Sequence, residues 1–150
     1  MQTLRTAIAA CSALAIAFHA HAVGPDFSGT WELDLRSAPE KLKNADCGTA
    51  SFVLLQSGDR ITGDHVMATT GCGRVNEGGE GTVKGVVMGS RAVLVVTSGR
   101  NGAVVMGTAT LRGAQLEWKV LEEIKDGEPK GDSPLILSRG LLARASSKSK

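Results

Sequence analysis

The side chains that could do chemistry are few, and His65 with its neighbour Asp64 is the first pair to consider. A histidine and a carboxylate commonly act together as general acid and base, provided that both reach one cleft. The surrounding segment has the pattern of a strand, and adjacent side chains of a strand point to opposite faces. The sequence also contains no Gly-x-Ser-x-Gly motif, which presents the nucleophilic serine of many hydrolases. We therefore expect a protein without catalytic activity.

A second charged group lies beside Trp118 and Leu121, and it consists of Glu117, Lys119, Glu122, Glu123 and Lys125. Alternating charges of this kind could line a site. In a strand that also carries two large apolar residues, they are more simply the solvated face. We interpret them as that face.

Cys47 and Cys72 are the cysteines that remain once Cys11, which lies in a leader-like segment, is set aside. An even number of cysteines outside the cytosol indicates a disulfide. A zinc site is the alternative, but His65 is the one histidine after residue 22 and the spacing matches no zinc pattern. We predict a Cys47–Cys72 disulfide, no metal and no cofactor. The glycine-rich residues 69–81 match no phosphate-binding fingerprint, so we interpret them as a mobile loop pinned at Cys72.

Residues 1–22 are typical of a secretory signal peptide. Arg5 precedes an apolar run over 7–18, and the small-residue triplet 20–22 follows, so we expect cleavage after Ala22. An N-terminal membrane anchor is the alternative, but the apolar run is shorter than the ~20 residues of a membrane-spanning helix. We predict an exported protein, periplasmic or secreted, without a transmembrane segment in its mature chain.

The charge distribution argues against a nucleic-acid partner. Of the 17 lysines and arginines only Arg5 lies in the leader, so the others nearly balance the 15 acidic residues. The two signs interleave along the chain, whereas nucleic-acid-binding proteins gather basic residues on one face. The length that remains suits one domain.

After Gly24 the apolar residues recur with a period of two, as in half-buried strands. Phe27, Trp31 and Leu33 share one face of the first strand. Such runs, mostly separated by joints of hairpin length, cover 27–35, 49–56, 60–68, 81–88, 91–98, 103–111, 115–124 and 134–139. Eight strands joined in this way predict an all-β fold, an eight-stranded antiparallel up-and-down barrel over residues 23–140, because closure removes exposed sheet edges.

Two local signals refine this barrel. Ser37 and Glu40 have capping-box spacing, which predicts a short helical turn after the first strand. Glycines within strands, such as Gly107, indicate a bend or a close approach of the backbone. A second interpretation is that Gly107 and Ala109 leave room for a ligand inside the barrel.

The first strand carries Gly29-Thr30-Trp31, a Gly-x-Trp motif followed by about eight antiparallel strands. This layout resembles the calycin superfamily, which includes lipocalins, fatty-acid-binding proteins, avidins and bacterial lipocalin-like proteins. In lipocalins an arginine from the end of the barrel packs across this tryptophan and closes the barrel. The resemblance assigns that role to Arg139, where a guanidinium over the indole would be favourable by about 0.5 to 2 kcal/mol. Gly29, Trp31 and Arg139 are the predicted closure.

The chain also departs from these families. It has only Trp31 and Trp118 and no tyrosine, unlike avidin-like biotin pockets. In place of the C-terminal helix of lipocalins, residues 141–150 are predicted to be a flexible cationic tail. The interior either binds a small apolar ligand or is filled by its own side chains. The predicted ligand contacts are Phe52, Leu54, Met67, Met106 and Trp118.

The layout is also similar to that of periplasmic lipocalin-like inhibitors of secreted metalloproteases, whose extended N-terminus enters the protease cleft. The corresponding arm would be Val23, Gly24, Pro25 and Asp26, unless these residues are only the frayed start of the chain. Two functions are therefore expected. The first is binding of a small apolar ligand in the barrel. The second is inhibition or other recognition of a secreted or periplasmic protein through the arm and the loops.

Overall fold

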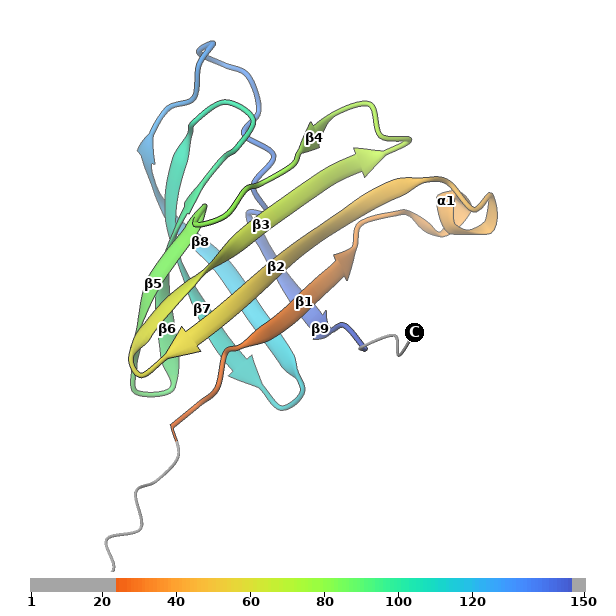
Figure 1. Cartoon of the computed structure of the whole chain (residues 1–150). Helices are drawn as coiled ribbons and strands as arrows, with labels where there is room; N and C mark the ends of the chain where they lie inside the picture. The colour runs from red at the N-terminus through yellow and green to blue at the C-terminus, as the bar shows by residue number, and fades with distance from the viewer. Residues whose placement is uncertain (1–23, 147–150) are drawn as a thin grey trace, which may run out of the picture.

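The computed structural model describes residues 24–146, which form a closed all-β barrel (Figure 1). The strands are β1 (Gly29–Asp34), β2 (Cys47–Ser57), β3 (Arg60–Thr70), β4 (Val75–Asn76), β5 (Val83–Met88), β6 (Arg91–Thr97), β7 (Val104–Arg112), β8 (Gln115–Lys125) and β9 (Arg139–Arg144). Eight of them form antiparallel pairs around the barrel, and β9 pairs with β1 to close it. The ninth, β4, pairs with β3 as an extra strand. The predicted eight-stranded barrel is confirmed.

The three hairpins β2–β3, β5–β6 and β7–β8 lie at one end of the barrel, which we call the base; the other end is the top (Figure 1). Each hairpin turns through two residues, as the register of its strands shows. Gly58 and Gly89 begin two of these turns with φ of 62° and 63°, a conformation that glycine adopts without steric cost. The N-terminal segment 24–28 also lies at the base.

Two local predictions are confirmed at the top. The helix α1 (Ala38–Leu42) follows β1, and the backbone N–H and Oγ of Ser37 both donate to Oε2 of Glu40, at 2.6 and 2.7 Å. The disulfide Cys47–Cys72 joins the start of β2 to the turn after β3. Residues 69–81, predicted to be a loop, also contain β4.

One cluster of buried apolar side chains forms the core inside the barrel. Inward positions alternate with outward ones along the strands, so the predicted period of two is confirmed in burial. Trp31, Phe52 and Trp118 are three of the four phenylalanine and tryptophan side chains in this core, each at most 1% exposed. The other members of the cluster are Phe27, Ala50, Leu54, Ile61, Val83, Ala92, Leu94, Val96, Val105, Ala109, Leu116, Leu137 and Leu142.

The last predicted strand is wrong in position. Residues 134–138 are not in a strand, and β9 begins at Arg139. The barrel domain consequently extends past residue 140, and residues 141–144 belong to β9 instead of a flexible tail. The run PLILSR and the run RGLLAR both suit a strand, so the pattern alone could not choose between them.

The predicted leader, residues 1–22, lies outside the described residues, as do 147–150 of the predicted tail. Within residues 24–146, no helix has the length and apolar character needed to cross a membrane.

Candidate functional site

Four of the five predicted ligand contacts face the barrel interior. Phe52, Leu54 and Trp118 are fully buried there, and Met67 packs partly buried against the same core. The ring centroid of Phe52 lies 4.3 Å from that of His65 and 5.2 Å from that of Trp118. The structure therefore brings these residues together as a packed core.

The fifth predicted contact, Met106, faces outward, and this prediction is wrong. Buried residues alternate with partly exposed ones along β7, and Val105 and Gly107 on either side of Met106 are buried. The side chain of Met106 therefore lies on the outer face. The sequence around it is apolar on both faces, so its direction could not be derived from alternation.

Gly107 makes room for a side chain of the protein itself. A Cβ at this position would lie 2.5 Å from Cη2 of Trp118 and 2.5 Å from the carbonyl oxygen of Lys119. Ala109, the register partner of Trp118, is fully buried beside it. The space that the small residues of β7 leave is thus occupied by the indole of Trp118.

Residues 134–138 run from the upper interior of the barrel to Ser138, which is exposed next to β9, and we call them the internal segment. Leu135 and Leu137 are each 5% exposed, and Ile136 packs against the core. The segment has no regular strand pairing. It fills space that a ligand of the barrel would occupy.

Side chains replace strand pairing as the hydrogen-bond partners of residues 134–137, whereas the carbonyl of Ser138 accepts from the main-chain N–H of Val120 in β8 at 2.8 Å. The bonds are Ser98 Oγ to the Pro134 carbonyl (2.7 Å), Asn76 Nδ2 to the Leu135 carbonyl (3.2 Å), Trp118 Nε1 to the Leu137 carbonyl (2.6 Å) and the Leu137 N–H to His65 Nε2 (3.1 Å). His65, Asn76 and Ser98 are the polar residues that are buried among those described, and all three serve this segment. Buried main-chain groups need partners, and a chain inside a closed barrel must take many of them from side chains.

His65 is held as one neutral tautomer. Its Nδ1 lies 2.8 Å from the carbonyl oxygen of Ser51, so Nδ1 carries the hydrogen, and Nε2 accepts from the N–H of Leu137. Burial lowers the pKa of His65 from 6.5 to about 4, although the Ser51 carbonyl and the charge of Asp64 act in the opposite direction. Both ring nitrogens are engaged, so the imidazole is not available as a base toward a substrate.

The base is closed by Trp31 and an arginine, but the arginine is Arg144 and the assignment of Arg139 is wrong. Cζ of Arg144 lies 4.2 Å from the ring centroid of Trp31, and Nε1 of Trp31 donates to the carbonyl of Phe27 at 2.9 Å. Arg139 is exposed at the start of β9, opposite Lys119 of β8. Gly29 holds its predicted place, because a Cβ there would collide with Nη1 of Arg144.

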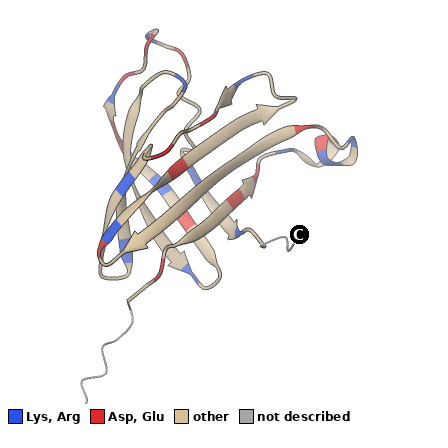
Figure 2. Cartoon of the chain, in the orientation of Figure 1, with Lys and Arg blue, Asp and Glu red and all other residues tan. Residues whose placement is uncertain are grey.

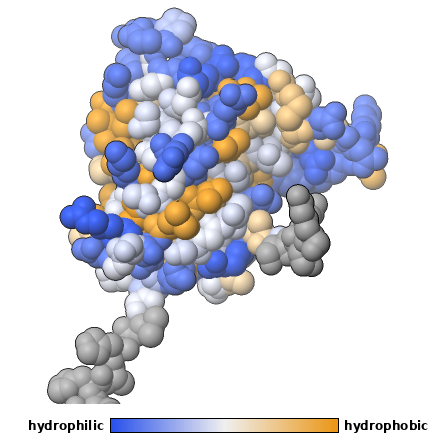
Figure 3. All heavy atoms as spheres, in the orientation of Figure 1, coloured by the Kyte–Doolittle hydropathy of each residue, from blue (hydrophilic) through white to orange (hydrophobic). Residues whose placement is uncertain are grey.

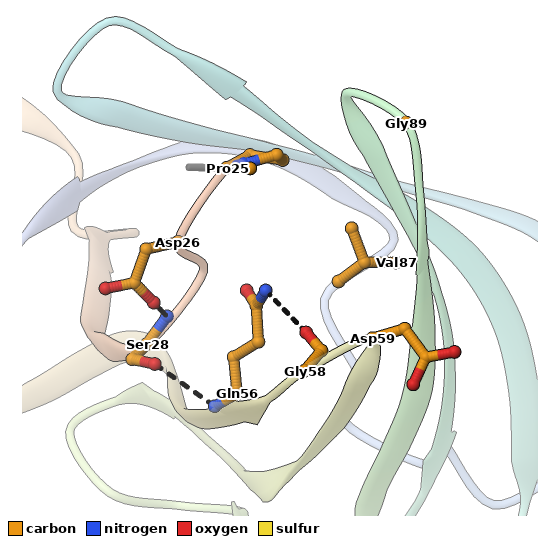
Figure 4. A pocket seen from close by; sticks show the side chains of 9 residues that line it. Pro25, Asp26, Ser28, Gln56, Gly58, Asp59, Val87 and Gly89 are labelled. Atoms are coloured by element: carbon orange, nitrogen blue, oxygen red, sulfur yellow. Dashed lines mark hydrogen bonds between the residues drawn. The ribbon is translucent and has the colours of Figure 1, made fainter. Parts of the chain in front are cut away.

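A hollow of about 610 Å³ lies at the base between the N-terminal segment and the hairpins. Figure 4 shows Pro25 and Asp26 on one side of it, Asp59 and Val87 on the other, and Gln56 between them. Its remaining lining residues are Gly24, Ser28, Gly58 and Gly89. Hydrogen bonds from the side chain and the backbone N–H of Ser28 lower the pKa of Asp26, and the N–H donates to Oδ1 at 2.9 Å. The carboxylate is therefore negative at neutral pH.

A second hollow, of about 450 Å³, lies on the outer face of β2 and β3. Val53 and Leu55 of β2, 41% and 66% exposed, are its large apolar residues. Figure 3 shows an apolar band on this face, bordered by hydrophilic residues. Asp64 and Glu80 are its charged lining residues, and its other members are Thr62, Gly63 and Gly81. Both signs of charge are scattered over the whole barrel (Figure 2), yet neither hollow is lined by a lysine or arginine.

The described residues contain no group of three or more histidine, cysteine or acidic side chains placed to hold a metal ion. The sequence matches no protein-family model, and neither a curated protein nor a solved structure matches it.

Few sequence patterns indicate the residues that line and fill the upper barrel. Asn76 lies in a glycine-rich stretch and Ser98 at a turn, so both resemble ordinary loop residues. His65 offers one usable signal, because strand periodicity places it on the same face as Ile61 and Met67. A histidine on an apolar face indicates a buried group that needs partners.

Proposed function

We propose that the protein acts without catalysis, outside the cytoplasm, by binding another protein through its base and the adjoining outer face of β2. The observation that carries this proposal is the position of the hollows. The interior is occupied by Phe52, Trp118 and the internal segment, whereas both hollows described above open on the outside and share β2: Gln56 lines one and Leu55 the other.

The residues of this surface indicate which side chains a partner would present to it. Val53 and Leu55 offer exposed apolar area, and exposed apolar patches bordered by polar residues are common at protein interfaces. Asp59 and Asp64 contribute negative charge, one to each hollow. A complementary partner presents lysine or arginine side chains next to apolar ones.

The N-terminal segment supports the same surface. Pro25 and Asp26 form one wall of the base hollow, next to the β2–β3 turn (Figure 4). A partner bound at the base would therefore contact both the segment and the hairpin, as the resemblance to lipocalin-like protease inhibitors implies. The leader-like residues 1–22 and the Cys47–Cys72 disulfide support an extracytoplasmic setting.

Site-specific photo-crosslinking tests this function. A benzophenone amino acid replaces Leu55 in one exported protein, and Leu121, which is 56% exposed on β8, in a matched control. We expect a discrete protein adduct at position 55 that disappears when Asp59 and Asp64 are both changed to lysine, and no such adduct at position 121. Equal labelling at both positions, or none at position 55, contradicts the proposal.

Binding of a small apolar ligand inside the barrel is the second candidate function. The observation that favours it is the aromatic cluster of Phe52, His65 and Trp118 directly below the internal segment. A ligand can reach these rings only if the segment moves. Native mass spectrometry of the exported protein tests this candidate, because a bound ligand adds a mass that leaves on denaturation.

A further inference from the structure

The internal segment is held differently from every strand around it. Its carbonyls at Pro134, Leu135 and Leu137 and its N–H at Leu137 bond to side chains from β3, β4, β8 and the β6–β7 loop. Its carbonyl at Ser138, next to β9, accepts instead from the main-chain N–H of Val120 in β8. These hydrogen bonds are made to the main chain of the segment, while its apolar side chains pack against the core of the barrel. The upper barrel therefore holds its own chain in the way that a binding site holds an extended peptide.

The conformation of the segment carries strain. Leu135 has a φ of 48°, in the left-handed region that a bulky residue rarely adopts. The segment is also preceded by residues 126–133, most of which are exposed. Its place in the barrel thus depends on the hydrogen bonds and on the burial of Leu135 and Leu137.

The hydrogen bond from Leu137 to His65 cannot form when the imidazole is protonated. Nε2 of His65 accepts from the N–H of Leu137, while Nδ1 is committed to the carbonyl of Ser51. A protonated imidazole has two donors and no acceptor. Its Nε2–H would face the N–H of Leu137, and the positive charge would lie against the ring of Phe52 in a buried site.

We propose that His65 is the latch of an acid-sensitive plug: when Nε2 gains a proton, residues 134–138 leave the upper barrel and expose an apolar site lined by Phe52 and Trp118. The site opened in this way would take an apolar group of extended shape, since that is what the segment itself presents. This device is separate from partner binding at the base and does not depend on it.

The imidazole of His65 is the group whose titration would open the segment, because the groups in contact with it do not titrate. From β2, its contacts are the ring of Phe52 and the carbonyl of Ser51, and from the internal segment its contact is the N–H of Leu137; none of these groups titrates. Asp64 is the charged group that affects His65: it lies on the outer side of the same strand, and its charge raises the pKa of the imidazole.

The size of the effect follows from the two states of the latch. The pKa of His65 is about 4 in the closed barrel and returns toward the ordinary 6.5 when the segment leaves. The open state therefore binds the proton more readily, and acidification favours opening between these two values. From pH 7 to pH 5 the open fraction should rise by about 20-fold.

Amide hydrogen exchange of the disulfide-bonded protein, followed by NMR, measures this opening directly. The protection factor of the Leu137 amide, corrected for the intrinsic effect of pH, should fall by about 20-fold from pH 7 to pH 5. The amide of Leu94 in β6 is the internal reference for unfolding of the whole barrel, and at both pH values its free energy of opening should stay above that of Leu137. The variant His65→Gln keeps an acceptor for Leu137 but cannot gain a proton, so its Leu137 protection should not change.

Other outcomes overturn the proposal. Equal free energies of opening at Leu137 and Leu94 mean that the segment leaves only when the whole barrel unfolds. Unchanged Leu137 protection in the wild type, or the same loss in His65→Gln, means that His65 is not the latch. If His65→Gln does not fold, ¹⁵N shifts of the wild-type imidazole replace it: the loss of Leu137 protection must level off over the pH range in which His65 titrates, near its folded pKa of about 4.

Discussion

The guanidinium of Arg144 lies over the indole of Trp31, with Cζ 4.2 Å from the ring centroid. Nη1 of the same arginine donates to the carbonyl of Ser28 at 2.6 Å. Gly29 permits this approach because it has no Cβ to collide with Nη1. The side chain of Arg144 in β9 thus packs against the Gly-x-Trp motif of β1. The two strands pair at this point and close the barrel.

The variant Arg144→Ala should therefore lower the free energy of unfolding by about 1 to 2 kcal/mol, since it removes a cation–π contact and a hydrogen bond. Arg139→Ala is the matched control, five residues earlier in the same strand, and should change stability by less than about 0.5 kcal/mol. Denaturant unfolding of both variants measures the difference. Equal losses would show that the contact with Trp31 does not stabilise the closure.

A methyl group at Gly107 should also destabilise the barrel. Gly107→Ala places a Cβ 2.5 Å from Cη2 of Trp118, and we expect a loss of about 1 to 3 kcal/mol from overpacking. The control is Gly73→Ala, in the turn after β3, where the nearest atom beyond its chain neighbours, Oγ1 of Thr69, would be 3.9 Å from the new Cβ. This change should stay within about 0.5 kcal/mol. Thermal unfolding separates the two, and a neutral Gly107→Ala would mean that Trp118 can shift freely.

The architecture was predictable because the strands carry their own signals. Alternating burial and hairpin glycines such as Gly58 and Gly89 define both the strands and their order around the barrel. The Ser37–Glu40 pair fixes the helical turn in the same local way. Period-two patterning could not distinguish residues 134–138 from a strand, because an extended apolar segment inside the barrel has the same composition as one in its wall.

The contacts within the site join distant parts of the chain, and for that reason they could not be predicted from the sequence. Leu137 meets His65 across 72 residues, and Asn76 meets Leu135 across 59. No local pattern encodes which of two nearby arginines reaches Trp31 either. Arg139 and Arg144 both follow apolar runs, and only the register of β9 against β1 selects Arg144.

Loss of the Cys47–Cys72 bridge should lower thermal stability strongly. The bond spans 25 residues, and closing a loop of that length removes unfolded-state entropy worth roughly 3.5 kcal/mol in the chain-entropy account. We expect the melting temperature to fall by more than about 8 °C after reduction, and by a similar amount in the double variant Cys47→Ser/Cys72→Ser. Calorimetry with thiol quantification measures it. A melting temperature that stays constant after verified reduction would remove the disulfide from the stability of the barrel.

The global stability should depend on pH through His65 with a defined sign. The pKa of His65 is lowered by burial to about 4 in the folded protein, against 6.5 when unfolded, so between these values the unfolded chain holds a proton that the native protein lacks. The free energy of unfolding therefore falls as the pH drops through this window, by about 2 kcal/mol from pH 7 to pH 5.

The carboxyls with lowered pKa, such as Asp26 and Glu40, act in the same direction but in a lower window, because their stabilisation is lost only as pH falls through their folded pKa. The difference between wild type and His65→Gln isolates the imidazole from these groups. Urea unfolding at a series of pH values should show the two proteins diverging between pH 7 and pH 5, with His65→Gln the less sensitive. Parallel curves over that range would mean that His65 is not held neutral by its burial.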